Sequence, residues 1–318
     1  MAHRMLAGIV LCFCAALQQG LTARGQQPEH SAPINLSHSL PIVKVLVDGQ
    51  GPFSFVIDTG TSDEAIISPS LARRLNLAPT GKKKLTDLAQ SGERMVDTVK
   101  LDVLSVAGAD FHDAQALISQ FPGADHDYDG ILGFLLFRDK QLTLDYPHKK
   151  VLFSDEPIPS ADVAQFTPFQ IRQGIPIVTI RVNGQEADAV VDSGGFGIDL
   201  PENISGKLGF SGNIAILAKG QTAVSSFLVR GGTMIGEIGL DGYRFGSPFV
   251  EMSSIFPMAS LGSTALRDFT ITFDQRSKLL RLSAAKKDHR VGVPEKDALH
   301  LPVTGDVVSQ AIMSHGQL

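Results

Sequence analysis

Cysteine is nearly absent from this 318-residue chain. The only two, Cys12 and Cys14, lie in one apolar run near the N-terminus. A mature chain that has lost this run contains no thiol, which excludes disulfides, cysteine catalysis and cysteine-ligated metals. A chain of this length can bury a core large enough to fold without cross-links.

An excess of basic residues is also missing, because 33 acidic side chains outnumber 28 Lys and Arg. Without a long basic stripe, a nucleic-acid partner is excluded, and Lys82-Lys83-Lys84 is expected to be a solvated loop face. The nine histidines include no pair at helical metal spacing, so we expect no metal and no cofactor. Asp125, Asp127 and Asp129 alternate as in a calcium loop, but the next glycine is misplaced and no glutamate closes the motif.

Long apolar runs are confined to residues 5–17. This run follows Arg4 and precedes small and polar residues, a pattern typical of a secretory signal peptide over residues 1–25. An uncleaved anchor is the alternative, although the run is short for a membrane span. We therefore expect a secreted or periplasmic protein that is not inserted in a membrane after cleavage.

Tryptophan is absent and tyrosine occurs three times, whereas glycine occurs 31 times and proline 17 times. The apolar stretches are short and are often interrupted by these turn-forming residues. This pattern favours a fold that is mostly β over a bundle of helices.

Two stretches of the chain match each other. LPIVKVLVDGQGPFSFVIDTGTS begins at Leu40, and IPIVTIRVNGQEADAVVDSGGFG begins at Ile175. Each predicts a hairpin, because Asp-Gly or Asn-Gly joins two apolar runs. Each second strand ends in an aspartate, Asp58 or Asp192. A carboxylate at the end of a buried strand is costly unless hydrogen bonds or a partner stabilise it.

The match continues downstream of both aspartates. Residues 68–77 and 200–210 each predict a short helix, and residues 131–153 match residues 260–282. Glycine turns are expected between these elements. The chain therefore consists of two related β-rich halves.

We expect an N-terminal lobe at residues 36–155, a C-terminal lobe at residues 166–284 and a polar C-terminal extension at residues 285–318. The two expected glycine turns are Ser91-Gly92 and Gly231-Gly232. Symmetry-related lobes can bring their equivalent loops face to face, so Asp58 and Asp192 would meet.

Two carboxyls in contact share one proton, because like charges at this separation cannot both ionise. The ionised member can take a proton from a water that attacks a peptide carbonyl, while the other donates a hydrogen bond to the carbonyl oxygen. The hydroxyls of Thr59 and Ser193 would bond backbone across the lobe junction. Gly60 and Gly194 would allow a tight turn.

At these residues the sequence resembles the pepsin and retropepsin clan of aspartic proteases, particularly the bacterial secreted retropepsin-like type. The resemblance covers nearly all of residues 36–284 and includes Ile131-Leu132-Gly133, an element that supports the active loop. It implies a bilobal pepsin-like fold with a cleft between two homologous lobes and Asp58 and Asp192 as the catalytic dyad. It also implies supporting roles for Thr59, Gly60, Thr61, Ser193 and Gly194, and substrate-covering hairpins around Gly92 and Gly231.

The sequence departs from that family at several positions. Gly195 replaces the hydroxyl or methyl residue that usually follows the second motif, and Ser260 replaces an apolar residue in the second supporting element. No tyrosine lies near the expected flap tip at Gly92. Thr61 can donate a hydrogen bond to Asp58, but Gly195 has no side chain to do so for Asp192. This predicts a pH optimum that is mildly acidic to near neutral.

The resemblance implies an aspartic endopeptidase whose partner is a polypeptide substrate, and we expect it to act as a monomer. The alternative is a catalytically inactive pepsin-like protein that binds peptides, or inhibits another enzyme, through its cleft.

Overall fold

The computed structural model describes residues 30–86, 93–121, 127–160, 162–221 and 226–292. The expected signal peptide, Gly92 and Asp125 lie outside these residues, as does the C-terminal extension from residue 293 onward. In the described ranges, no helix is long and apolar enough to cross a membrane. The structure is mostly β, as the sequence predicts, and its strands form three sheets.

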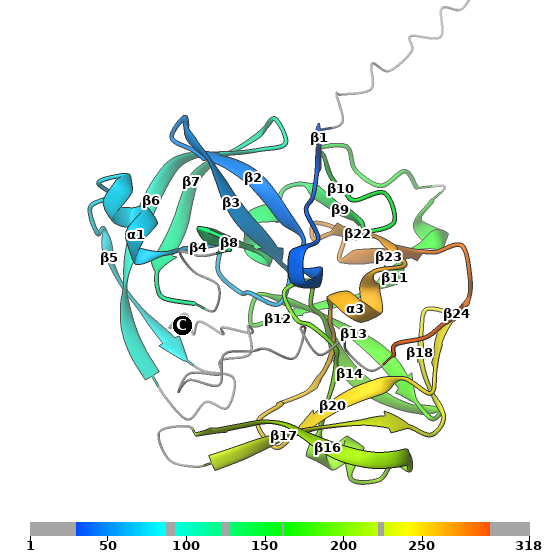
Figure 1. The fold of residues 1–318 in the computed structure, drawn as a ribbon. Coiled ribbons are helices and arrows are strands. Elements are labelled where there is room, and N and C mark those ends of the chain that lie inside the picture. The colour runs from blue at the N-terminus through cyan, green and yellow to red at the C-terminus, as the bar shows by residue number, and fades with distance from the viewer. Residues whose placement is uncertain (1–29, 87–92, 122–126, 161, 222–225, 293–318) are drawn as a thin grey trace, which may run out of the picture.

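The first sheet is built by the first half of the chain. In sheet order it contains β2 (Ile42–Val47), β3 (Gln50–Asp58), β8 (Gly130–Gly133), β4 (Ala65–Ile67), β7 (Ala109–Ile118), β6 (Glu93–Val106) and β5 (Gly81–Thr86). β2 also pairs with β6, which closes six of these strands into a barrel. Figure 1 shows them together in blue to green.

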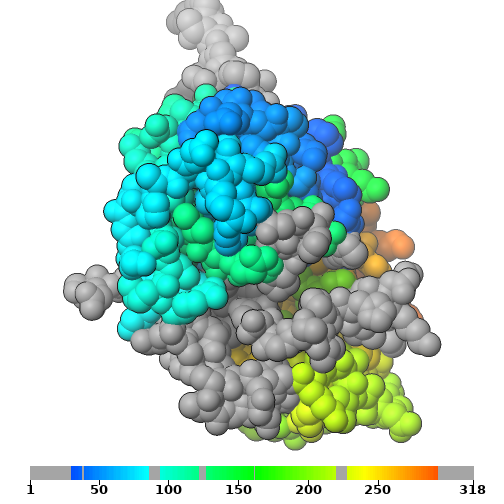
Figure 2. Space-filling view, turned by 60° about the vertical axis from the view of Figure 1, so that its left-hand side comes forward, coloured from blue at the N-terminus to red at the C-terminus, as the bar shows by residue number. Residues whose placement is uncertain are grey.

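The second sheet is built by the second half of the chain. In order it contains β16 (Phe210–Gln221), β17 (Ser226–Met234), β20 (Phe249–Ser253), β15 (Ile198–Pro201), β21 (Ala259–Leu261), β14 (Gln185–Val191), β13 (Ile175–Val182), β18 (Glu237–Leu240), β19 (Tyr243–Gly246) and β24 (Asp288–His289), with β12 (Gln170–Arg172) paired to β13. In Figure 2 its yellow-green residues lie on the same face of the molecule as the cyan residues of the first half.

The third sheet takes strands from both halves. In order it contains β1 (His30–Pro33), β10 (Lys150–Ser154), β9 (Gln141–Asp145), β22 (Thr270–Asp274), β23 (Leu279–Ser283) and β11 (Thr167–Pro168). β9 and β22 pair antiparallel, so Leu142 faces Phe273 and the two halves share one hydrogen-bonded sheet.

The helices are short. They are α1 (Pro69–Arg74), α2 (Glu202–Ser205) and α3 (Ser263–Leu266), with 3-10 turns η1 (Ser37–Ser39), η2 (Phe134–Phe137) and η3 (Val163–Gln165). α1 and α2 lie inside the two segments predicted to be helical. The Ser68 hydroxyl accepts a hydrogen bond from the Leu71 amide and caps α1.

The two predicted hairpins are confirmed. Asp48 and Gly49 join β2 to β3, and Asn183 and Gly184 join β13 to β14, all four with positive φ. A two-residue turn with positive φ at both positions matches the twist of paired strands, which is why Asp-Gly and Asn-Gly are favoured there.

The same strand pairings then follow in both halves. β3 pairs parallel with β8, and β14 pairs parallel with β21. β8 and β21 each accept a further antiparallel neighbour, β4 and β15. The main core lies on one side of these strands and includes Phe55, Ile57 and Val191.

Two predictions about local structure are wrong. Lys82, Lys83 and Lys84 lie on β5 and pair in register with β6, rather than in a loop. Gly231 lies within β17 between two paired strands, and the β16–β17 connection falls at residues 222–225, outside the described residues. Gly231 has no side chain because the Phe249 ring and the Leu217 side chain occupy the space of a Cβ atom.

The C-terminal segment differs from the expected polar extension, and the first described residues also form a strand. Residues 30–33 form β1 at the edge of the third sheet. In the C-terminal segment, β24 pairs with β19, and the buried His289 ring packs 4.4 Å from the Phe269 ring, centroid to centroid.

Candidate active site

Asp58 and Asp192 come together from the two halves of the chain. Asp58 is the last residue of β3 and Asp192 directly follows β14; their exposed fractions are 1% and 5%. Gly60 lies against the Asp192 carboxyl, so a Cβ atom there would be 2.5 Å from Asp192 Oδ1. Gly194 lies in the same way against the Asp58 carboxyl. These glycines are required because each faces the carboxyl of the other half.

Thr59 and Ser193 form a reciprocal set of hydrogen bonds between the halves. The Thr59 hydroxyl donates to the Val191 carbonyl (2.6 Å) and accepts from the Ser193 amide (3.0 Å). The Ser193 hydroxyl donates to the Ile57 carbonyl (2.7 Å) and accepts from the Thr59 amide (3.0 Å). All four bonds are buried, so the backbone before each aspartate is fixed to the opposite half.

Each carboxyl accepts two local hydrogen bonds. Asp58 accepts from the Gly60 amide (2.8 Å) and the Thr61 hydroxyl (2.8 Å). Asp192 accepts from the amides of Gly194 (3.0 Å) and Gly195 (2.8 Å). The backbone amide of Gly195 therefore acts on Asp192 as the Thr61 hydroxyl acts on Asp58.

This arrangement corrects the reasoning behind the expected pH optimum. Gly195 does supply a donor to Asp192, although it has no side chain. A Cβ atom on Gly195 would lie 2.8 Å from Asp192 Oδ2, so a hydroxyl residue cannot be added without moving the carboxyl. The loss of a side-chain donor at this position is thus no reason for a higher pKa.

Burial, followed by the charge of Asp192, holds the pKa of Asp58 well above its usual range. Burial also raises the pKa of Asp192, but hydrogen bonds from the Gly195 amide, from Asp58 and from the Gly194 amide oppose this rise. Two buried carboxyls that interact in this way hold one proton between them. The pair therefore consists of one protonated and one ionised carboxyl.

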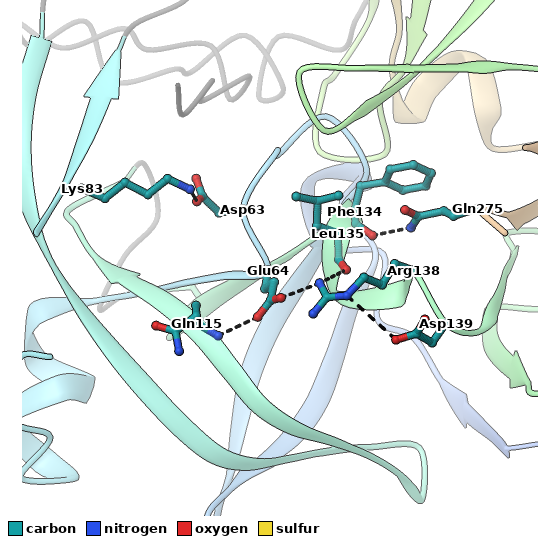
Figure 3. Close-up of polar contacts among 9 residues, drawn as sticks. All are labelled: Asp63, Glu64, Lys83, Gln115, Phe134, Leu135, Arg138, Asp139 and Gln275. Atoms are coloured by element: carbon teal, nitrogen blue, oxygen red, sulfur yellow. Dashed lines mark hydrogen bonds and ion pairs between the residues drawn. The ribbon is translucent and has the colours of Figure 1, made fainter. Parts of the chain in front are cut away.

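The loop after Asp58 is anchored by the Leu132-Gly133 element and by Phe134, which follows it. The Phe134 amide donates to the Thr61 carbonyl (2.9 Å), and the Gly133 amide donates to the Glu64 carbonyl (3.0 Å). Arg138 forms an ion pair with Glu64 and donates to the Leu135 carbonyl (2.9 Å) (Figure 3).

The loop after Asp192 is anchored in the same way. The Gly262 amide donates to the Gly197 carbonyl (2.7 Å), and the Ser263 amide donates to the Gly195 carbonyl (2.9 Å). A Cβ atom on Gly262 would lie 2.6 Å from the Gly197 carbonyl oxygen. Both halves therefore place a glycine directly under the loop that carries the aspartate.

An ion pair between a partly exposed lysine and a buried aspartate links the first loop to the β5–β6 hairpin. Lys83 Nζ lies 2.7 Å from Asp63 Oδ1, and the Asp63 side chain is 4% exposed (Figure 3). β5 and β6 continue toward residues 87–92, which include the expected flap position Gly92 and lie outside the described residues. The hairpin is thus joined to the loop of Asp58 by this ion pair, in addition to the pairing of β6 with β7 and β2 in the sheet.

Sequence reasoning missed three groups near Asp58 and Asp192. The Tyr146 hydroxyl is buried without a hydrogen-bond partner in the described structure; burial and the charges of Asp192 and Asp58 raise its pKa. Asp199 and Glu251 lie in the second sheet, and the charge of Asp192 reaches Asp199. Only the departure at Ser260 signalled that this region differs from its counterpart in the first half.

Within the described residues, no group of three or more His, Cys, Asp and Glu is arranged to hold a metal ion. Asp129, from the segment that resembles a calcium loop, instead accepts a hydrogen bond from the Ser54 amide (2.9 Å). It thereby fixes the residue before β8 to β3.

The model of an aspartyl protease family matches residues 43–135. The match includes the Asp58 motif and the Leu132-Gly133 element that anchors it, and supports an aspartic protease family. No curated protein matches the chain.

Proposed function

We propose that this protein is a secreted or periplasmic aspartic endopeptidase with a bilobal pepsin-like fold, in which Asp58 and Asp192 form the catalytic dyad. The observation that carries the proposal is the reciprocal packing of the two carboxyls against Gly194 and Gly60. The family match over residues 43–135 supports it.

In the proposed reaction, a water molecule bound between the carboxyls attacks the carbonyl carbon of a peptide bond. The ionised carboxyl of the pair accepts the proton of this water, and the protonated carboxyl donates a hydrogen bond to the carbonyl oxygen. The tetrahedral intermediate then breaks its C–N bond as the amine takes up the proton that the carboxyl accepted from the water, and the carboxyl is ionised again. The four cross-half hydrogen bonds keep the carboxyls at a fixed separation, so little reorganisation is needed during the reaction.

The test is hydrolysis of an unfolded protein by wild type, Asp58→Asn and Asp192→Asn. Each variant should lose nearly all activity, by about three orders of magnitude or more, because neither carboxyl alone provides both acid and base. Each should unfold at a temperature equal to or above that of wild type at neutral pH. Ionisation of a buried carboxyl with a raised pKa costs stability, and an amide avoids that cost.

Activity near wild type in either variant would rule out the dyad. Peptide binding without hydrolysis by wild type would favour the alternative of an inactive, peptide-binding relative. Export is tested separately, since the intact mass of the protein from its host should correspond to a chain that starts near residue 25.

A further inference from the structure

One row of side chains crosses four neighbouring strands in each half, and the two rows have opposite chemistry. In the first half, strand pairing places in one row Val56, Ile131, Ile66 and Leu117. In the second half, the equivalent pairings place in one row Val190, Ser260, Asp199 and Glu251. Three apolar residues are thus replaced by one hydroxyl and two carboxyls at equivalent positions.

These rows lie on the face of the sheets that carries the dyad. Side chains alternate along a strand, so Val56 points to the same side as Asp58, and Val190 to the same side as Asp192. In the first half, the row packs with Leu85 and Val96 of the β5–β6 hairpin in a cluster separate from the main core. The first row therefore belongs to a buried apolar cluster beside Asp58 and beneath that hairpin.

The polar side chains of the second row have no hydrogen-bond or ion-pair partners among the described residues. Asp199 and Glu251 are half-buried, and among the described residues neither side chain takes part in a hydrogen bond or ion pair. Arg230, on the neighbouring strand β17, instead pairs with Glu202 at 2.7 Å. The Ser260 hydroxyl is also unpartnered, on a residue 9% exposed that lies opposite Asp199 in the strand pairing.

The carboxyls of this row lie close to the dyad. A Cβ atom on Gly197, in the loop that follows Asp192, would be 3.1 Å from Glu251 Oε1. Burial, then the charges of Glu251 and Asp192, hold the pKa of Asp199 well above its usual range. Burial raises the pKa of Glu251 to about 7. Unpaired carboxyls in such a place are costly, and a cation would relieve that cost.

We propose that Asp199, Glu251 and Ser260 bind the cationic side chain of a lysine or arginine in a peptide substrate, next to the bond that is cleaved. The ammonium or guanidinium group would lie between the two carboxyls, with the Ser260 hydroxyl as a further acceptor, and the aliphatic stem would contact Val190. This inference rests on the proposed function and adds a substrate class to it.

The test compares two peptides that differ only by lysine or norleucine next to a site cut in an unfolded protein. Wild type should prefer lysine by about tenfold or more in kcat/KM. In the double variant Asp199→Asn/Glu251→Gln, which keeps the shape of both side chains, the preference should fall to about twofold or less. Glu202→Gln removes an exposed carboxylate of the same half and should leave the preference unchanged. Thermal unfolding establishes that the variants are folded.

A binding measurement separates this inference from the proposed function. The protein used is the Asp58→Asn variant, because this change lies in the first half and leaves the polar row intact. Calorimetry measures its affinity for two short alanine-leucine peptides, one with a central lysine and one with a central norleucine. The difference between the two affinities reports on the row alone. Tighter binding of the lysine peptide supports the row even if wild type hydrolyses nothing. Equal affinity for the two peptides, or hydrolysis by wild type without any preference for basic residues, would overturn it.

Discussion

At the scale of single residues, the site depends on glycines that cannot be replaced, because a larger side chain would overlap a carboxyl. Gly60 and Gly194 each lie against a carboxyl of the opposite half, and Gly195 lies against its own aspartate. The sequence shows these residues as parts of ordinary turn motifs. The structure gives the physical reason for them, which is the approach of two carboxyls that are 134 residues apart in the chain.

The buried carboxyl of Glu251 predicts a pH-dependent stability. Its pKa is about 7 in the folded protein against an ordinary value of 4.5. Between these values the folded state binds more protons than the unfolded state, so this residue lowers stability as pH rises through the window. Glu251→Gln should therefore raise Tm by a few degrees at about pH 8 and by less at about pH 5.

Thermal unfolding across this pH range measures the effect. Glu202→Gln is the control, because this exposed side chain already pairs with Arg230. An increase in Tm that is the same at both pH values would show that Glu251 is not a carboxyl with a raised pKa.

At the scale of elements, the β5–β6 hairpin offers a matched pair of lysines. Lys83 bonds the nearly buried Asp63, whereas its neighbour Lys82 pairs with Asp97 on the exposed surface of the same hairpin. Lys83→Met should cost roughly 1.5–3 kcal/mol of stability, the usual cost of losing a hydrogen bond to a charged group. Lys82→Met should cost at most about 1 kcal/mol, as for other exposed pairs.

If the hairpin covers the substrate, Lys83→Met should also lower kcat/KM, because the loop of Asp58 loses its connection to β5. Denaturant unfolding and peptide hydrolysis measure the two effects. Equal losses for the two lysine variants would mean that the Asp63 contact does not position the hairpin.

Hairpins, short helices and the mostly β class could be predicted because their signals are local. Asp48-Gly49 and Asn183-Gly184 need positive φ, and Ser68 caps a helix through its own neighbours. The position of Gly231 could not be predicted. A glycine that makes room for Phe249 has the same sequence signal as a glycine that forms a turn.

The polar row of Ser260, Asp199 and Glu251 could not be predicted from the sequence for a related reason. Ser260, Asp199 and Glu251 are far apart in the sequence, and only strand pairing places them side by side. The repeat drew attention to Ser260, because its partner in the first half, Ile131, is apolar. Asp199 and Glu251 lie where the two halves have diverged, so the repeat gave no register for them.

At the scale of the whole molecule, the approach of Asp58 to Asp192 depends on how the two halves are held together, and the proposed dyad depends on it in turn. Ser193→Ala would leave the Ile57 carbonyl and the Thr59 amide without their buried partner, and Thr59→Val would do the same to the Val191 carbonyl and the Ser193 amide. Each unsatisfied buried group costs roughly 1–3 kcal/mol, so each variant should lose about 2–6 kcal/mol.

Both hydroxyls belong to one network, so the losses in the double variant should not add. The control is Thr143→Val, which removes another hydroxyl contact between the halves, to Thr272 at 2.9 Å in the third sheet. All three single variants should be less stable in denaturant, but only Thr59→Val and Ser193→Ala should also lower kcat, because they alone alter the spacing of the carboxyls. If Thr143→Val lowered kcat as much as Ser193→Ala, the hydroxyls of Thr59 and Ser193 would stabilise the fold without setting the geometry of the dyad.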